Sequence, residues 1–453
     1  MNSGDERLFI QPAYSTPEPN VPIRLYEGSF EVEQDSGRVV VTGYVDLMWV
    51  PSPAIQIAFN TTSTDSTNRP DVFKLGLASL YLPRASRATR IDIITVRLFS
   101  DEYFAREWEP LCVGDGQNLT HMVLHLVNFP DTHGMVISNP DSHCKWLGRF
   151  VLGADGWKTT VDKVEHYSSL YKSLRSFGGY AITHTVKLER EDGGSFTADQ
   201  ADILLEDLRY FFSFANGCWT DTTLKVGFDE NGTAIWEQWG RPRASSWRWV
   251  SSWFNDWKPE PLTRFWPDFY TRLHDPLWGE TLRRAINWYL TANIGTSMYE
   301  GNIILAQAGH ELLAWTLFVA EGGLTSEGFD KLPAADKLRL LLQRAQVPAK
   351  VPTLLQFLDK LCQTDKWADG SKKEKWVDGP HAVTQIRNKL VHPNPKNLQI
   401  LQNLSVDELQ DAHILSMWYL ELTLLYIFGY KDEYANRLNY TTRTGQTEPV
   451  PWL

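Results

Sequence analysis

The chain has 453 residues, which is more than one typical compact domain uses and predicts two or three domains. Hydrophobic residues make up 43% of the chain and charged residues 22%, which is the composition of an ordinary soluble globular protein with hydrophobic cores. The formal net charge of -11 excludes a protein coated in basic surface for nonspecific nucleic-acid binding, so any RNA site must be a local basic patch.

The N-terminus has no basic start followed by an apolar run, so no signal peptide is expected. The nearest candidate for a membrane span, residues 303–320, is interrupted by Gln307, His310 and Glu311 and is predicted to be a buried helix. The four cysteines lack the paired spacing of a zinc site or a disulfide framework, which fits a reducing cytosol. We therefore expect a cytoplasmic protein with no membrane contact.

Residues 1–170 are predicted to form a β-rich N-terminal domain. Alternating or β-branched runs separated by turn residues indicate an antiparallel sandwich-like or barrel-like sheet. The expected strands are residues 23–27, 29–32, 38–50, 54–59, 73–82, 91–99, 121–127 and 148–152. The polar Thr/Ser run at 60–68 predicts an exposed loop. No glycine-rich phosphate loop or metal-type histidine pair occurs here, so binding or sensing is the expected role.

Residues 171–259 are predicted to be an α+β extension that ends in a tryptophan-rich connector. A strand is expected at 180–188 and a helix at 198–214, where apolar residues recur at helical spacing. The Asn-Gly pair at 231–232 predicts a hairpin between residues 223–228 and 234–239.

Five tryptophans then lie close together in the sequence: Trp247, Trp249, Trp253, Trp257 and Trp266. One interpretation is a platform on which bases stack, because aromatic faces accept any base. The other is an aromatic seam that packs the N-terminal region against the helices. Interleaved prolines and acidic residues favour the seam.

Residues 260–453 are predicted to form a helical bundle, in which the most apolar helix, residues 298–320, is central. The other expected helices are residues 280–293, 334–345, 352–364, 381–391 and 406–428. A polar exposed loop is expected at 366–379 and an extended tail at 440–453. The whole chain is therefore predicted to be α+β, with a β-rich region followed by an all-α domain.

The stretch from Gln385 to Pro393 places an arginine and a histidine where a helical pattern meets prolines. In an unbroken helix the side chains of Arg387 and His392 would point about 140° apart. Pro393 disfavours helical geometry at the preceding residue, so the helix should end near Val391 and let the imidazole turn back. A permanent cation with a planar donor fork and a group that titrates near neutrality suit phosphoryl chemistry without a metal.

Arg387-Asn388 followed by three residues and His392, late in a set of apolar helices, resembles the signature of HEPN-domain ribonucleases. The β-rich region before the helices is similar to the ApeA-like branch of that family, whose members act in anti-phage defence and abortive infection. The resemblance implies metal-independent and cofactor-free cleavage of RNA, with tRNA as one candidate substrate. The ribose 2′-hydroxyl would attack the adjacent phosphate and leave a 2′,3′-cyclic phosphate.

The same resemblance implies roles for individual residues. His392 would act as general base, general acid or donor to the phosphate, and Arg387 would hold the phosphorane. Asn388 would orient one of these two or bind a phosphate oxygen. HEPN active clefts form between two helical domains, which implies a homodimer.

Two further sets of residues are candidates for support. Glu311, in the middle of the central helix, is expected either to pair with Arg387 or to make an unrelated buried salt bridge. Lysines bracket the Arg-His stretch and are expected to form an electropositive rim, with Lys389 in support of the site. The tentative RNA-binding set is Lys372, Lys373, Lys375 and Lys396. A charge run of this kind is also typical of a solvated loop.

We therefore expect an RNA-cleaving effector whose N-terminal region senses a trigger such as a phage-derived molecule. The alternative is a noncatalytic, dimeric binding or scaffold protein that keeps HEPN-type helices. A third interpretation, a carbohydrate-binding β-sandwich with a helical appendage, ranks last because the tryptophans concentrate outside the best strands.

Overall fold

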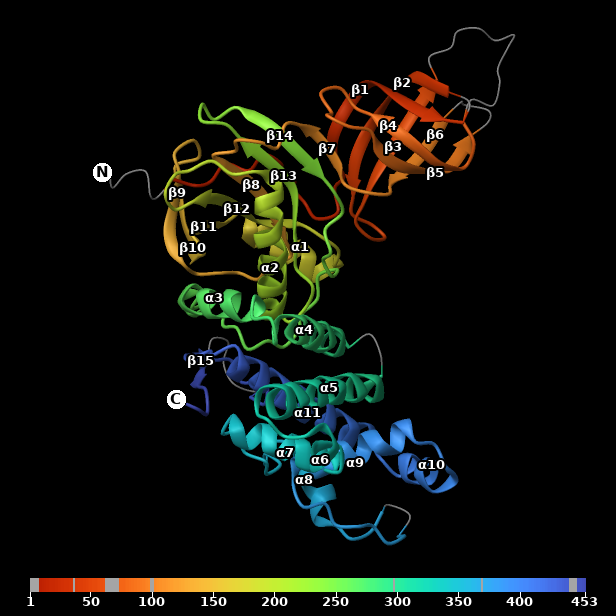
Figure 1. Cartoon of the computed structure of the whole chain (residues 1–453), viewed down its shortest axis with the longest axis vertical. Coiled ribbons are helices and arrows are strands. Elements are labelled where there is room, and N and C mark those ends of the chain that lie inside the picture. The colour runs from red at the N-terminus through yellow and green to blue at the C-terminus, as the bar shows by residue number, and fades with distance from the viewer. Residues whose placement is uncertain are drawn as a thin grey trace. The chain divides into compact units, whose positions relative to one another are not determined.

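The computed structural model describes residues 8–35, 37–61, 73–97, 102–295, 298–367, 370–439 and 446–453. The chain divides into two compact units, Met1–Arg209 with Thr220–Trp249, and Tyr210–Trp219 with Val250–Leu453. The first unit is built on strands and the second on helices, so the predicted α+β class is confirmed (Figure 1).

Antiparallel strands at the start of the first unit close into a barrel in the order β1-β2-β3-β6-β5-β4 (Figure 1). Their bounds are β1 Ile23–Gln34, β2 Gly37–Met48, β3 Ala54–Thr61, β4 Gly76–Tyr81, β5 Thr89–Arg97 and β6 Glu102–Glu107. Ile55 and Ile57 of β3 lie on either side of the partly exposed Gln56, and both are fully buried in the core. Gly43 permits the close approach of β2 and β3, because a Cβ there would lie 2.0 Å from the carbonyl oxygen of Ala58.

The remaining strands of the first unit form an open antiparallel sheet in the order β7-β14-β13-β8-β12-β11-β10-β9. Their bounds are β7 Leu111–Gly114, β8 His121–Val127, β9 Met135–Asn139, β10 Cys144–Ala154, β11 Trp157–Lys163, β12 Ile182–Arg190, β13 Thr222–Phe228 and β14 Ala234–Trp239. Helices α1 (Tyr167–Phe177) and α2 (Ala198–Asn216) lie between strands of this sheet in the sequence. Strands from before and after residue 170 therefore share one sheet.

The second unit contains helices α3 to α11 (Figure 1). Their bounds are α3 Glu260–Leu273, α4 Gly279–Ile294, α5 Tyr299–Trp315, α6 Ser326–Asp330, α7 Ala334–Arg344, α8 Gln356–Gln363, α9 Gly379–Val391, α10 Pro395–Gln402 and α11 Val406–Ile427. A π-helix, Thr316–Glu321, continues α5, and β15 (Glu433–Tyr434) pairs with β16 (Glu448–Pro449) near the C-terminus.

Helix α5 packs against α4, α7, α9 and α11, and α11 packs against α4, α5, α7, α8 and α9, so these two helices together form the centre of the helical unit. Gly309 lets α11 approach, since a Cβ there would lie 2.9 Å from the side chain of Leu420. Tyr299–Glu321 is also long and apolar enough to cross a membrane by length and composition. A core helix of a soluble protein passes the same test, so this one segment of the described chain is weak evidence for a membrane span.

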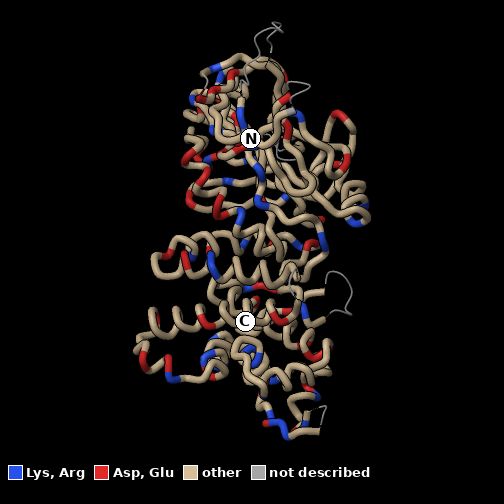
Figure 2. The backbone as a smooth tube through the Cα atoms, turned by 90° about the vertical axis from the view of Figure 1, so that its right-hand side faces the viewer, with Lys and Arg blue, Asp and Glu red and all other residues tan. Residues whose placement is uncertain are grey.

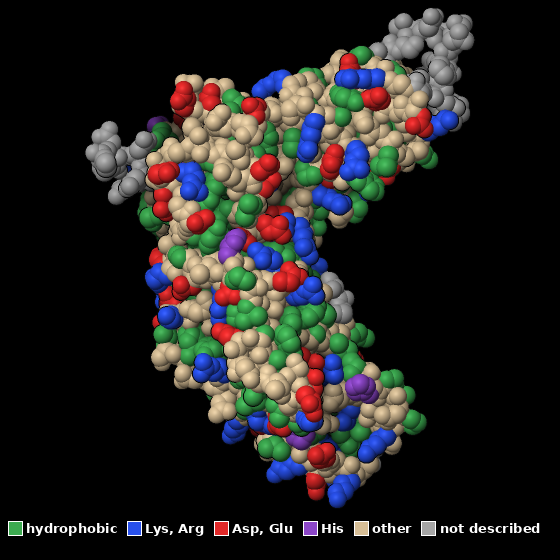
Figure 3. All heavy atoms as spheres, viewed as in Figure 1, with side chains coloured by type: hydrophobic (Ala, Val, Ile, Leu, Met, Phe, Trp, Pro, Cys, Tyr) green, Lys and Arg blue, Asp and Glu red, His purple; other side chains and the backbone are tan. Residues whose placement is uncertain are grey.

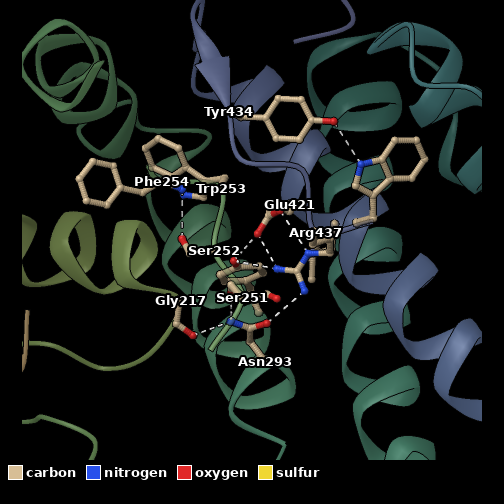
Figure 4. Close-up of polar contacts among 12 residues, drawn as sticks. Gly217, Ser251, Ser252, Trp253, Phe254, Asn293, Glu421, Tyr434 and Arg437 are labelled. Atoms are coloured by element: carbon tan, nitrogen blue, oxygen red, sulfur yellow. Dashed lines mark hydrogen bonds and ion pairs between the residues drawn. The ribbon is translucent and has the colours of Figure 1, made fainter. Parts of the chain in front are cut away.

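A buried polar network joins α4, α11 and the C-terminal segment of the helical unit (Figure 4). Arg437 donates to both carboxylate oxygens of Glu421, and both side chains are almost fully buried. Tyr289 donates to the same carboxylate at 2.5 Å, and Arg437 also donates to Asn293 at 3.1 Å. Asn293 in turn donates to the carbonyl oxygen of Ser251 at 2.8 Å. Every charge in this network has a partner, so its role is structural.

The tryptophans of the connector fall into three environments. Trp247 contacts Tyr171 in the first unit. Trp253 and Trp266 are buried in the aromatic core of the helical unit. Trp249 and Trp257 are exposed. Parts of four predicted segments, residues 62–68, 98–99, 368–369 and 440–445, lie outside the described residues.

Candidate active site

The start of α9 is fixed by Asp378. Its carboxylate caps the helix by accepting the backbone N–H of His381 at 2.9 Å. Arg339 of α7 holds the same carboxylate through two donors, at 2.5 and 3.0 Å. The helix that carries the Arg-His stretch is thus anchored at one end by a bidentate ion pair.

The end of α9 agrees with the sequence prediction, because the helix stops at Val391 and His392 is its C-cap. His392 has φ −118° and ψ 76°, outside the helical region, as expected before Pro393. Its backbone N–H still donates to the carbonyl oxygen of Asn388 at 3.1 Å. Its own carbonyl oxygen accepts from the side chains of Asn394 and Asn397, at 3.3 and 2.7 Å. The backbone of His392 is therefore held on both sides, while its side chain is exposed.

Arg387 lies one turn before the end of α9 and is mostly buried, with 23% of its side chain exposed. Its Nη2 lies 3.8 Å from Oε1 of Glu311 on α5, and its Nη1 donates to Oδ1 of Asn388 at 3.2 Å. Its Nε is buried without a hydrogen-bond partner. The guanidinium is thus oriented by one carboxylate and one amide, and it retains donors for an anion.

The structure brings Arg387, Asn388 and Glu311 together, but it records no contact between Arg387 and the ring of His392. Within the described residues, no hydrogen bond or ion pair engages that ring. In a single chain the two groups therefore sit on neighbouring turns without a direct link.

Three lysines of the predicted rim are exposed and form no ion pair with any described residue: Lys372, Lys375 and Lys396. Lys389 is half-buried and donates to Gln385 at 3.1 Å. Burial, followed by the nearby charge of Lys396, lowers the pKa of Lys389, while Glu374 opposes that change. In the views of Figures 2 and 3, basic and acidic residues are mixed over most of the described chain, and several basic residues lie at the α7–α10 end.

Lys373 has a different environment from the other lysines. It is buried, its ammonium lies 4.2 Å from the ring centre of Trp376, and it donates to the carbonyl oxygens of Thr364 and Glu374 at 3.3 Å. Burial lowers its pKa. Lys373 therefore anchors the segment that presents Lys372 and Lys375, and its own ammonium is not available at the surface.

The sequence analysis did not identify the residues that hydrogen-bond to Glu311 and His392. Gln307, 2% exposed, donates to Glu311 at 3.2 Å, and its signal was the four-residue spacing of two polar residues in an apolar helix. Asn394 and Asn397 fix the turn after His392, and the signal there was an asparagine before a proline.

Among the described residues, no three His, Cys, Asp or Glu side chains are arranged to hold a metal ion.

Comparison with known proteins adds a family context. Residues 114–250 match the model of the YopA central domain, and residues 275–448 match that of the YopA C-terminal domain. The chain is similar to YopA proteins. One such relative is the SPbeta prophage-derived uncharacterized protein YopA of Bacillus subtilis (strain 168), 26% identical over 459 residues and covering 99% of both chains. The YopA C-terminal match contains Glu311, Arg387 and His392. No solved structure matches the chain significantly.

Proposed function

We propose that this protein is a metal-independent endoribonuclease that acts as an effector in phage–host conflict. The observation that carries the proposal is the state of the charges around α9. In a chain of net charge -11, a mostly buried arginine keeps free donors five residues before an exposed histidine, and three lysines that flank this stretch in the sequence have no ion-pair partner in the described chain. Unpaired cations beside a donor fork are suited to a polyanion such as RNA.

The chemistry follows from the two groups. A base, for which His392 is the candidate, takes the proton of the ribose 2′-hydroxyl as its oxygen bonds to phosphorus. Arg387 donates to the phosphorane oxygens, which carry extra negative charge in the transition state. The P–O5′ bond then breaks, and the leaving oxygen accepts a proton from an acid. The products are a 2′,3′-cyclic phosphate and a 5′-hydroxyl, and DNA is not a substrate because it lacks the nucleophile.

A homodimer through the helical unit completes the proposal. Ile304, Ala308, Glu311 and Trp315 follow one another at three- or four-residue spacing along α5, and all are at least partly exposed. This stripe of α5 is apolar except for Glu311, which contacts Arg387. A second copy packed there would bury apolar surface and supply its own histidine close to the site. Sedimentation velocity tests this point, because Trp315→Lys should convert the dimer to a monomer.

The biological setting is proposed from the relative and from the architecture. The relative is prophage-derived by its name, which is compatible with a role in conflict between phages and their host. The strand-rich unit would sense a trigger and release the activity of the helical unit. Adding a lysate of phage-infected cells to the purified full chain should then raise RNA cleavage above that seen with a lysate of uninfected cells.

The deciding experiment is cleavage of a mixed tRNA and mRNA pool in EDTA, with candidate triggers present. Arg387→Ala and His392→Ala should each lower cleavage by about 10³-fold, and wild-type products should end in cyclic phosphate. Two matched controls should cleave like wild type: Arg344→Ala on α7 and His274→Ala. His274 is, like His392, an exposed helix C-cap. Equal cleavage by all five proteins would contradict the proposal.

The second candidate function is a noncatalytic dimeric binding protein. The observation that favours it is the lack of a recorded contact between Arg387 and the His392 ring. It predicts RNA or protein binding without cleavage under any of these conditions, and binding that survives His392→Ala.

A further inference from the structure

Gln307 is a buried polar side chain in α5, one of the two central helices of the bundle. Only 2% of it is exposed, and α5 around it is apolar, with Ile303, Ala306 and Leu313 buried. Burial of an amide in such a place is unfavourable unless its donors and acceptor are used. The contact that uses its amide nitrogen is therefore informative.

That contact leads toward the candidate site. Nε2 of Gln307 donates to Oε1 of Glu311 at 3.2 Å, one helical turn further along α5. The same oxygen of Glu311 lies 3.8 Å from Nη2 of Arg387. Since Glu311 is 39% exposed, solvent alone would leave its carboxylate several rotamers. The buried amide selects the one that faces Arg387.

The contacts continue from Arg387 to the histidine. Nη1 of Arg387 donates to Asn388 Oδ1 at 3.2 Å, and the carbonyl oxygen of Asn388 accepts the backbone N–H of His392 at 3.1 Å. A series of polar contacts thus runs from the interior of α5 to the end of α9. Gln307 is its innermost member.

We propose that Gln307 is a positioning residue: it fixes the carboxylate of Glu311, and Glu311 holds the guanidinium of Arg387 in the orientation that meets the transition state. This inference rests on the ribonuclease function proposed above. Gln307 touches no reacting atom and acts through its neighbour. A guanidinium displaced by about 1 Å loses much of its effect on the transition state while its charge remains available to bind RNA.

The test uses the full-length protein under the cleavage conditions that are active for wild type. Gln307→Met removes the donor and keeps the length of the side chain, so the packing of α5 is preserved. The matched control is Thr316→Val, which removes another buried polar group that follows α5, with hydrogen bonds to Leu312 and Thr281 but none to the site. Melting temperatures of both variants show that each is folded.

Single-turnover cleavage then separates positioning from binding. We expect Gln307→Met to lower the maximal rate about tenfold with an unchanged half-saturating RNA concentration. Thr316→Val should leave both quantities unchanged. The double variant Gln307→Met/Glu311→Gln should cleave no more slowly than Glu311→Gln alone, because Gln307 acts only through Glu311.

A second readout is independent of RNA cleavage. In protein labelled with 15N at arginine Nε, the buried Nε–H of Arg387 should exchange slowly with water in wild type and in Thr316→Val. The resonance is assigned by its loss in Arg387→Lys. It should exchange markedly faster in Gln307→Met.

The outcomes distinguish the two proposals. Wild-type cleavage that disappears in Arg387→Ala but is unchanged in Gln307→Met overturns the positioning role and leaves the ribonuclease. If wild type and Arg387→Ala behave alike, the ribonuclease proposal fails, and unchanged exchange of Arg387 in Gln307→Met then also overturns the positioning role.

Discussion

The two units treat their buried histidines in opposite ways. In the strand-rich unit, His125 is fully buried; its Nε2 accepts the backbone N–H of Tyr14 at 2.9 Å, and its Nδ1 lies 2.9 Å from the carbonyl oxygen of Leu224. In the helical unit, His310 is equally buried, neither ring nitrogen makes a hydrogen bond of good geometry, and the polar group that faces the ring is the backbone of Ser416. One histidine is part of a satisfied network, whereas the other lies unsatisfied next to Glu311.

Paired and unpaired lysines can be compared in a similar way. In the strand-rich unit, Lys163 and Lys225 pair with Asp131 and Asp202, each at 2.5 Å. Around α9, the exposed Lys372 and Lys396 pair with no described residue. Lys145 and Lys172 of the strand-rich unit are also exposed and form no ion pair with a described residue. The proposal that the lysines around α9 bind RNA therefore rests on their place around the Arg-His stretch in the sequence, and not on their lack of a partner.

The largest expected effect is one that the two units should share. Each contains a buried arginine–carboxylate pair, Arg149 with Asp162 and Arg437 with Glu421. Asp162→Leu and Glu421→Leu each leave a buried arginine unpaired, so each should lower the free energy of unfolding by about 3–5 kcal/mol. Chemical denaturation measures the loss, and hydrogen exchange should locate it in the unit that carries the substitution.

The exposed pair of Arg284 with Glu280 is the matched control for this measurement. Glu280→Ala should cost less than about 1 kcal/mol, because exposed ion pairs contribute little. A cost as small for Glu421→Leu would mean that the network of Figure 4 does not stabilise the unit as described.

The same substitution in the two units should have unequal effects. His125→Leu leaves the N–H of Tyr14 and the carbonyl of Leu224 without their partner, at a cost of about 2–4 kcal/mol. His310→Leu removes only a poorly formed contact with the backbone of Ser416 and replaces a buried polar ring by an apolar side chain, so the free energy of unfolding should change by less than about 1 kcal/mol. Thermal and chemical unfolding at pH 7 provide the comparison. Equal losses would remove the distinction between the two histidines.

The pH dependence of stability is a second test of His125. Burial lowers the pKa of His125 from 6.5 to about 4, against the opposing effect of its carbonyl partners. Between pH 6.5 and 4 the unfolded chain binds a proton that the folded chain does not, so the stabilisation present above pH 6.5 is lost as pH falls. The loss from this group alone is at most about 3 kcal/mol. The unfolding curve of His125→Leu should be flatter over this range than that of wild type, and a parallel dependence would show that His125 does not govern it.

Much of the fold could be predicted from the periodicity of apolar residues along the chain. The strands and the helix that were missed have physical causes. Predicted and observed bounds agree for β8, because five of its seven residues are apolar and only two histidines interrupt the run. Short strands such as β7 and β9 were missed, since pairing with neighbours distant in sequence makes them strands. Helix α10 was missed because two prolines were interpreted as a stop. Pro395 instead occupies the first helical positions, where its missing N–H has no consequence, and Asn394 caps the helix.

Only part of the candidate site could be predicted, because some of its contacts join residues that are distant in sequence. The end of α9 at Val391 follows from the local effect of Pro393. The approach of Glu311 to Arg387 joins residues on different helices, and no local spacing determines it. The sequence likewise grouped Lys373 with its exposed neighbours, although two tryptophans enclose it in the fold.

The smallest expected effects concern the unpaired lysines and test the contrast in cations directly. In a His392→Ala background, which prevents cleavage, Lys372→Ala, Lys375→Ala and Lys396→Ala should each reduce the slope of log affinity for single-stranded RNA against log salt by about 0.7. Stability should change by less than about 0.5 kcal/mol, because these side chains make no ion pair in the described chain. Lys225→Ala is the control, since its ammonium is neutralised by Asp202 and should leave the salt slope unchanged. If the three lysines behave like Lys225, they form a solvated rim, and the RNA phosphates must be bound elsewhere.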